Sequence, residues 1–242
     1  MKLTLAKQKN KTQLADQYQK QGFVKVSNAL SESTLSTIHE FIDKQAQWNL
    51  ALNHHGKHQD FNNLEVAKWS EDKKQQFEDV IFAQASDGFQ YLYEAIPIYD
   101  IFTQNLLADH FFNDIVRFLN TEATLDFFRE ILAAPQITFM DAQLTRFGAG
   151  HFLNTHNDKN RVAAMVINLT KQWRPDWGGA LHLLDDEQQI EQSFLPSFNE
   201  INIFKIPRDH YVGYVSPFAT GKRLAITCWL RSGENPLVKS KS

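Results

Sequence analysis

The spacing of the apolar residues changes at Pro135, and this change constrains the fold more than any other feature. Before this point, apolar residues recur at the three- and four-residue spacing of a helix face. The stretches with this pattern are 35–42, 111–119 and 125–132. Ser31 and Thr121 precede two of them and are residue types that cap helix N-termini. Because proline cannot continue a helix, residues 1–135 are predicted to form a helix-rich supporting region.

After Pro135 the apolar residues alternate with a period of two, which is typical of β-strands. The alternation begins at Ile137. Short strands bounded by turn signals, with no helical pattern between them, favour an antiparallel sandwich or barrel over residues 136–233. Residues 234–242 are predicted to be a tail, and the polar stretch 54–63 is predicted to be a loop. The further predicted strands are 161–169, 179–184, 200–206, 211–216 and 223–231.

The composition excludes several classes of protein. The chain has 242 residues, of which 43% are hydrophobic and 12% aromatic, so it can bury a sizeable core. Its net charge of −3 gives no electrostatic basis for binding nucleic acid. No apolar run reaches the ~18 residues of a membrane span, and residues 1–21 lack the apolar segment of a secretory signal. Together with a single cysteine, Cys228, these features predict a cytoplasmic protein without an internal disulfide.

One H-x-D triplet carries the strongest chemical signal. In an extended backbone, residues two apart point to the same side, so His156 and Asp158 are expected to project together. His210, from a neighbouring strand, can supply a third ligand to the same ion. Two histidines and one carboxylate that leave open positions are typical of non-haem Fe(II) oxygenases, whereas a structural zinc site is closed by four ligands. Such triplets also occur by chance in solvated turns, and a lone histidine is more often a satisfied polar group.

The last predicted strand has two faces of different character. Leu224, Ile226, Cys228 and Leu230 form an apolar face that is suited to packing against helices. Arg223, Ala225, Thr227 and Trp229 share the other face. This face is either the polar side of an edge strand or the inside of a barrel mouth. In a barrel, the arginine can bind a carboxylate through two parallel hydrogen bonds, and the threonine can add a third.

The order of these motifs resembles the Fe(II)/2-oxoglutarate-dependent dioxygenases. An H-x-D triplet, a distal histidine and then R-x-A-I-T-x-W are found here in the order of that superfamily, over about 139–231. The sequence is most similar to the prolyl-hydroxylase branch, which includes the hypoxia-inducible-factor prolyl hydroxylases. Further matching pieces are 146–148, 168–173 and 177–181.

The resemblance implies an α+β fold, with a double-stranded β-helix (a jelly-roll, cupin-like core) and N-terminal helices packed on its major sheet. It implies Fe(II) held by His156, Asp158 and His210. It also implies 2-oxoglutarate and O2 as co-substrates, ascorbate as a supporting reductant, and the distal carboxylate of 2-oxoglutarate held by Arg223 and Thr227. The co-substrate region would further include Asn168 and Trp229.

Two positions depart from the pattern of the relatives, and a third residue, Trp229, has two interpretations. Tyrosines that help bind the co-substrate in some relatives are replaced here by Phe147 and Asn168. A phenyl ring cannot donate a hydrogen bond, whereas an amide can. The loss of the hydroxyl is expected to weaken co-substrate binding or to move that role to another residue. Trp229 is either a wall of the cavity or a core aromatic.

The resemblance implies a hydroxylase that oxidises a C–H bond while 2-oxoglutarate is decarboxylated to succinate. The predicted substrate is a prolyl residue of a peptide or protein. The alternatives are a free amino acid or metabolite as substrate, and a non-catalytic barrel that binds a metal or a partner. No nucleic-acid or membrane partner is expected. The substrate's identity, the carbon oxidised and the oligomeric state do not follow from the sequence.

Several other polar residues have both a functional and a structural interpretation. His54, His55 and His58 with Asp60 form a second possible metal cluster, although an exposed loop is favoured. His151 and Asn154 either orient the metal ligands or lie in a loop, and His182 is either a core or a site residue. Arg174, Arg208 and Arg231 either line a substrate groove or carry surface charge. The acidic run 185–187 with Glu191 is predicted to be a solvated hairpin tip.

Overall fold

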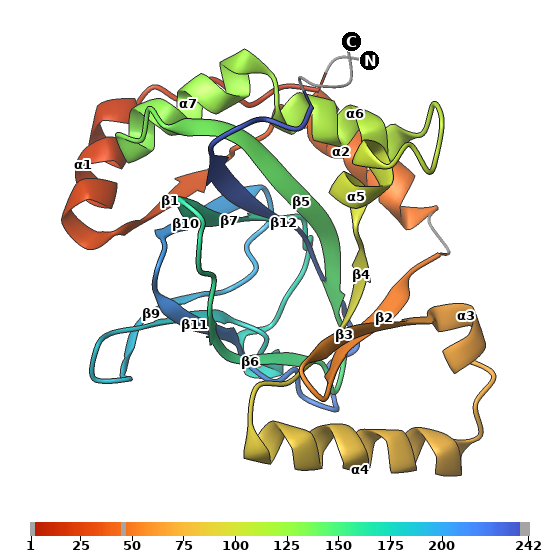
Figure 1. Cartoon of the computed structure of the whole chain (residues 1–242). Helices are drawn as coiled ribbons and strands as arrows, with labels where there is room; N and C mark the ends of the chain where they lie inside the picture. The colour runs from red at the N-terminus through yellow and green to blue at the C-terminus, as the bar shows by residue number, and fades with distance from the viewer. Residues whose placement is uncertain (1–2, 45–46, 238–242) are drawn as a thin grey trace.

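The computed structural model describes residues 3–44 and 47–237, and its elements enclose a barrel (Figure 1). The predicted tail is therefore described only as far as residue 237. The helices are α1 (Lys11–Gln21), α2 (Glu32–Asp43), α3 (Asn63–Val66), α4 (Glu71–Asp87), α5 (Ile98–Thr103), α6 (Phe111–Leu119), α7 (Glu122–Leu132) and the short 3₁₀ helix η1 (Pro175–Trp177). The strands are β1 (Phe23–Ser27), β2 (Asn49–His54), β3 (Lys57–Asn62), β4 (Tyr91–Ile96), β5 (Ile137–Phe147), β6 (Phe152–Asn157), β7 (Ala163–Asn168), β8 (Leu181–Leu184), β9 (Ile190–Phe194), β10 (Glu200–Lys205), β11 (Asp209–Val212) and β12 (Arg223–Ser232).

The barrel consists of two antiparallel layers that meet at β4. The major layer has the order β1-β10-β7-β12-β5, and the minor layer has the order β6-β11-β8-β9. From β5 onward, successive strands alternate mostly between the two layers, which is the winding of a double-stranded β-helix. Strands that are far apart in the sequence are therefore neighbours, and residues from β6, β11 and β12 can face one cavity.

The two faces of β12 are distributed as its sequence predicts. The strand pairs with β5 on one side and β7 on the other, so it lies in the middle of the major layer. Its apolar face packs in the core beneath the helices, and its other face lines the barrel. The residues beneath the helices are Leu224, Ile226, Cys228 and Leu230, and those inside the barrel are Arg223, Ala225, Thr227 and Trp229.

Helices cover the outer face of the major layer. In Figure 1, α1, α2, α5, α6 and α7 lie together on this side of the barrel, and α4 lies on the opposite side. Ile38, Phe128 and Ile131 are fully buried in the same core cluster as Met140 and Ile226. The hydroxyls of Ser31 and Thr121 accept hydrogen bonds from backbone amides in the first turns of α2 and α7, as their sequence positions predict. The helices therefore brace the layer that carries β12.

Two of the predicted local structures are wrong. Residues 54–63 were expected to be a loop, but most of them form the β2–β3 hairpin, which pairs with β4 through β2. The hairpin is stabilised because Leu50, Leu52 and Leu92 form an apolar cluster with residues of α4. The strand expected at 211–216 is shifted, because β11 spans Asp209–Val212 and only its last two residues fall in the predicted range.

A charge cluster around the buried Glu94 anchors β4 to the major layer. Glu94 contacts the guanidinium of Arg146 and lies 3.0 Å from the ammonium of Lys222. Burial alone raises the pKa of Glu94, but the hydrogen bonds and charges of Arg146 and Lys222 outweigh burial and hold that pKa below its ordinary value. Among the described residues, no helix is long and apolar enough to cross a membrane.

Candidate active site

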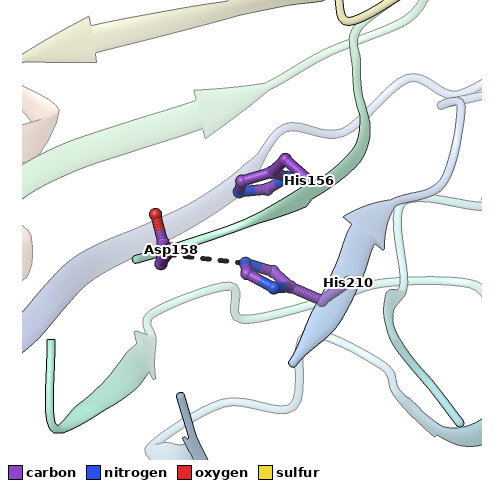
Figure 2. Close-up of side chains that lie close together, drawn as sticks. All are labelled: His156, Asp158 and His210. Atoms are coloured by element: carbon purple, nitrogen blue, oxygen red, sulfur yellow. Dashed lines mark ion pairs between the residues drawn. The ribbon is translucent and has the colours of Figure 1, made fainter. Parts of the chain in front are cut away.

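The pairing of β6 with β11 brings together the two histidines that the sequence analysis singled out. His156 lies directly opposite His210 in the register, and their ring centroids are 4.1 Å apart. Asp158 follows the end of β6, and one of its carboxylate oxygens is 3.6 Å from Nε2 of His210. Figure 2 shows the two rings and the carboxylate converging. The potential ligand atoms of these three residues all lie within 4.8 Å of one another, so they can share one metal ion.

Hydrogen bonds to the backbone orient both rings. Nδ1 of His156 is 3.0 Å from the carbonyl of Asn154, and Nδ1 of His210 is 2.9 Å from the carbonyl of Arg208. A carbonyl can only accept, so each Nδ1 carries the proton and each neutral ring keeps its lone pair on Nε2. Metal-binding histidines are commonly fixed in this way. The rings therefore present the correct nitrogen to a shared ion.

The contact between His210 and Asp158 is not a salt bridge at neutral pH. Burial is the main cause that lowers the pKa of His210 to about 4, so its ring is neutral. A neutral imidazole is the form that binds a metal. The donor set of two imidazoles and one carboxylate fits Fe(II) with open coordination positions.

Trp229 has a specific contact with the third residue of the cluster. Its indole N–H donates a hydrogen bond of 2.6 Å to one oxygen of Asp158. The guanidinium of Arg161 lies over the same indole, 5.2 Å from the ring centroid. Trp229 therefore orients the carboxylate and lines the cavity, and it also packs against the buried apolar cluster inside the barrel.

A cavity of about 260 Å³ inside the barrel connects the three residues with Arg223. Its deep end holds Arg223, which is 3% exposed, and its outer end holds Phe89, which is 46% exposed. Between them the walls are largely apolar, with Phe147 and Val166 contributing to the buried lining. The site is thus a narrow cleft with a cation at its closed end.

Arg223 is buried without an acidic partner among the described residues. Its Nε has no hydrogen-bond partner, and its guanidinium lies over the ring of Phe147 at 5.1 Å. Burial lowers the pKa of Arg223 to about 10, which still leaves it charged at neutral pH. A buried charge normally has a partner, because desolvation is costly. An anionic ligand at the closed end of the cavity would supply that partner.

The other predicted co-substrate residues are placed differently from one another. Thr227 lines the cavity, and its hydroxyl lies 3.0 Å from that of Thr145. Asn168 is buried and donates hydrogen bonds to the side chain of Asn202 and the backbone of Glu200, and it does not line the cavity. The structure therefore brings Thr227 to the site but not Asn168.

The remaining polar candidates mostly have structural contacts. Nδ1 of His151 accepts a hydrogen bond from the backbone N–H of Gly148. Asn154 acts on the site through its carbonyl, which orients His156. His182 stacks on Tyr211 outside the cavity. The three arginines pair with nearby carboxylates: Arg174 with Asp176, Arg208 with Glu191, and Arg231 with Asp141.

β4 and the hairpin supply a part of the cavity that could not be predicted from the sequence. Tyr91 and Tyr93 line the cavity from β4, and His58 reaches it from β3. Tyr93 stacks on Phe147, with ring centroids 4.9 Å apart, so it brings a phenol close to a position where some relatives carry a tyrosine. The alternation Tyr91-Leu92-Tyr93 was a detectable strand signal, but nothing in the sequence showed that this strand joins the barrel.

The fold and the site define a class of protein: a double-stranded β-helix with a two-histidine, one-carboxylate cluster beside a buried arginine. Comparison with known families agrees with this class. Residues 142–231 match the family model of the 2OG-Fe(II) oxygenase superfamily. The resemblance predicted from the sequence is therefore confirmed. No curated protein matches the chain.

Solved structures confirm the predicted fold class. An oxidoreductase of the 2OG-Fe(II) oxygenase family from Burkholderia pseudomallei is 13% identical, with a TM-score of 0.61 over 98% of this chain and 99% of the other. A Pseudomonas putida prolyl-4-hydroxylase is 12% identical, with a TM-score of 0.57 over 93% and 100%. A Trichoplax adhaerens prolyl hydroxylase in complex with a peptide of hypoxia-inducible factor is 16% identical, with a TM-score of 0.59 over 96% and 93%.

Proposed function

We propose that this protein is an Fe(II)- and 2-oxoglutarate-dependent dioxygenase that hydroxylates a prolyl residue of a peptide or protein. One observation carries the proposal. A two-histidine, one-carboxylate cluster and an unpaired, buried Arg223 face the same narrow cavity. The cluster fits Fe(II), and the arginine fits the distal carboxylate of a dicarboxylic acid that also reaches the metal.

Each residue then has a definite role. Bound iron and 2-oxoglutarate supply the chemistry of O2 activation and C–H oxidation, with release of succinate and CO2. His156, Asp158 and His210 hold the iron, and Trp229 orients the carboxylate ligand. Arg223 anchors the co-substrate, with the hydroxyl of Thr227 beside it on the same face of β12. The apolar walls exclude water from the oxidant.

The size of the cavity and the structural neighbours support a peptide substrate. The co-substrate and the reacting group share a cavity of about 260 Å³, so only a small group such as one side-chain ring can enter beside the co-substrate. The rest of the substrate must then lie outside, along the hairpin. Two neighbours of similar fold are prolyl hydroxylases, and one of them binds a peptide.

The test is a turnover assay that separates this proposal from a non-catalytic barrel. Protein, Fe(II), ascorbate and 2-oxoglutarate are mixed without oxygen, O2 is admitted, and succinate and CO2 are measured. The proposal predicts one succinate for each CO2, and faster turnover with proline-containing peptides than with free proline. Turnover that only free amino acids stimulate would favour the small-molecule alternative. No succinate under any condition would contradict the dioxygenase function.

A further inference from the structure

Three residues form a hydrogen-bonded row at the mouth of the cavity: Asp60, His58 and Tyr91. Nε2 of His58 is 3.1 Å from a carboxylate oxygen of Asp60, and Nδ1 of His58 is 2.7 Å from the hydroxyl of Tyr91. Both His58 and Tyr91 line the cavity. The side chain of His58 is 55% exposed, whereas Tyr91 is only 8% exposed. The row thus leads from the solvent to the inside of the site.

The strand order β3-β2-β4 explains why these residues meet. Asn53 of β2 is the register partner of His58, and β2 in turn pairs with β4. The opposite face of this small sheet is occupied by the leucines that pack against α4, so His58, Asp60, Tyr91 and Tyr93 share the face toward the cavity. Residue alternation in the sheet therefore places the side chains of the row on one face.

The protonation of His58 decides what Tyr91 presents to a ligand. An ionised carboxylate only accepts, so Nε2 of His58 donates to Asp60. When His58 is neutral, its Nδ1 accepts the phenolic hydrogen of Tyr91, and the phenol offers only lone pairs to the cavity. When His58 is doubly protonated, Nδ1–H donates to the phenolic oxygen, and the hydroxyl hydrogen of Tyr91 is free to donate to a ligand.

A prolyl substrate distinguishes the two states. A prolyl residue has no backbone N–H, so near its ring it offers carbonyl acceptors and no donor. We propose that the Asp60–His58–Tyr91 row determines specificity for a prolyl peptide, with Tyr91 donating a hydrogen bond to a substrate carbonyl when His58 is doubly protonated. This inference rests on the proposed function and assigns to it residues that lie outside the metal and co-substrate positions.

The surroundings of His58 favour the doubly protonated state. The hydrogen bond to Asp60 raises the pKa of His58, and this effect outweighs its partial burial. The other titratable groups on these strands are Tyr91, Tyr93 and Glu94 on β4, and His54, His55 and Lys57 near the tip of the hairpin. Glu94 lies on the opposite face with Leu50 and Leu92, where it pairs with Arg146 and Lys222. Burial raises the pKa of both tyrosines, so they stay neutral. Asp60 is thus the acidic partner that sets the behaviour of His58.

The experiment measures kcat/KM for proline-containing peptides by succinate formation, with poly-L-proline as the first probe. The assay covers about pH 5.5 to 8.5, a range that brackets the ordinary pKa of histidine. Activity is expected to be high while His58 is protonated and to fall as the pH rises through its pKa. Asp60→Asn removes the group that raises this pKa, so the fall is expected to move to lower pH. Tyr91→Phe is expected to lower kcat/KM about 2- to 12-fold, the value of one hydrogen bond, and to remove this pH dependence.

Two further measurements separate the row from a merely structural role. NMR titration of the His58 ring is expected to show a lower pKa in Asp60→Asn than in wild type. His54→Gln is the matched control, because His54 lies on the same hairpin and contacts His55 but does not line the cavity. This variant is expected to keep the wild-type profile and the wild-type KM for the peptide.

The possible outcomes are distinct. A pH profile that stays in place in Asp60→Asn, or that persists in Tyr91→Phe, would overturn the assignment of the row. Succinate formation that no proline-containing peptide stimulates would overturn the prolyl-carbonyl donor role but leave the dioxygenase function standing. The absence of any succinate in wild type would instead show that the proposed function itself has failed, and the inference would fall with it.

Discussion

Replacing Arg223 with methionine is expected to weaken co-substrate binding and to stabilise the free protein. Arg223 is buried, its Nε lacks a partner, and among the described residues no carboxylate pairs with it. A ligand carboxylate would therefore provide its main charge partner. Methionine has about the length of the arginine's aliphatic stem and no charge, so Arg223→Met keeps the packing of the stem and removes the guanidinium.

The structure sets the size of both effects. Losing one partner of a buried, hydrogen-bonded charge pair costs about 2 to 5 kcal/mol, or roughly a 30-fold to 5,000-fold rise in the KM for 2-oxoglutarate. In the free protein, burial lowers the pKa of Arg223 from 12.5 to about 10. At ~1.4 kcal/mol for each pKa unit, this corresponds to an unfavourable contribution of about 3 kcal/mol to folding. This value is the upper limit of the increase in the free energy of unfolding that Arg223→Met can produce.

Thermal unfolding with and without ligand measures both effects in one series. Without 2-oxoglutarate, the variant is expected to melt several degrees above wild type, at roughly 2 to 4 °C for each kcal/mol. With Mn(II) and 2-oxoglutarate under argon, wild type is expected to gain stability as the ligand concentration rises, and the variant is expected to gain little. Equal ligand-induced stabilisation of the two proteins would refute the role of Arg223. A less stable free variant would refute the argument from its missing partner.

Three other perturbations test separate parts of the structure. Trp229→Phe removes the hydrogen bond to Asp158 and is expected to weaken Mn(II) binding about 10- to 100-fold, measured by metal titration; unchanged affinity would contradict the orienting role. Glu94→Gln removes the charge that Arg146 and Lys222 share and is expected to cost about 1 to 3 kcal/mol in urea unfolding at pH 7, because Lys222 is half exposed and solvent screens part of the interaction. Because the pKa of Glu94 is lowered in the folded state, this difference is present above the ordinary glutamate value of 4.5 and is lost as the pH falls below it; a pH-independent difference would contradict the account. Zn(II) and Co(II) are expected to displace Fe(II) and stop succinate formation, and activity sustained by zinc would exclude a redox mechanism.

The barrel could be predicted from the sequence because its strands carry local signals. The period of two after Ile137 predicted β5, β7, β10 and β12 of the major layer but not β1, which lies before Pro135. The two faces of β12 correctly placed four side chains beneath the helices and four inside the barrel. The β2–β3 hairpin could not be predicted in the same way. Its second strand is exposed along its whole length and polar except for Phe61, so no alternation of apolar residues marks it.

The site could be predicted only where a motif marks it. His156 and Asp158 are close in sequence, and the family order pointed to His210, whereas only the pairing of β6 with β11 brings all three together. Tyr91 and Tyr93 were missed because β4 lies well before the barrel strands in the sequence and joins them through tertiary pairing alone. The histidines at 54, 55 and 58 were read as one group, but only His58 lines the cavity.

The central claim is that one metal ion and one dicarboxylic acid occupy the cavity together. A crystal structure with Mn(II) and 2-oxoglutarate, grown without oxygen and phased on the anomalous signal of manganese, tests this claim most directly. The account predicts a single strong anomalous peak bonded to His156, Asp158 and His210, with the distal carboxylate of 2-oxoglutarate on Arg223. A peak at any other position, or a carboxylate that leaves Arg223 unpaired, would contradict it.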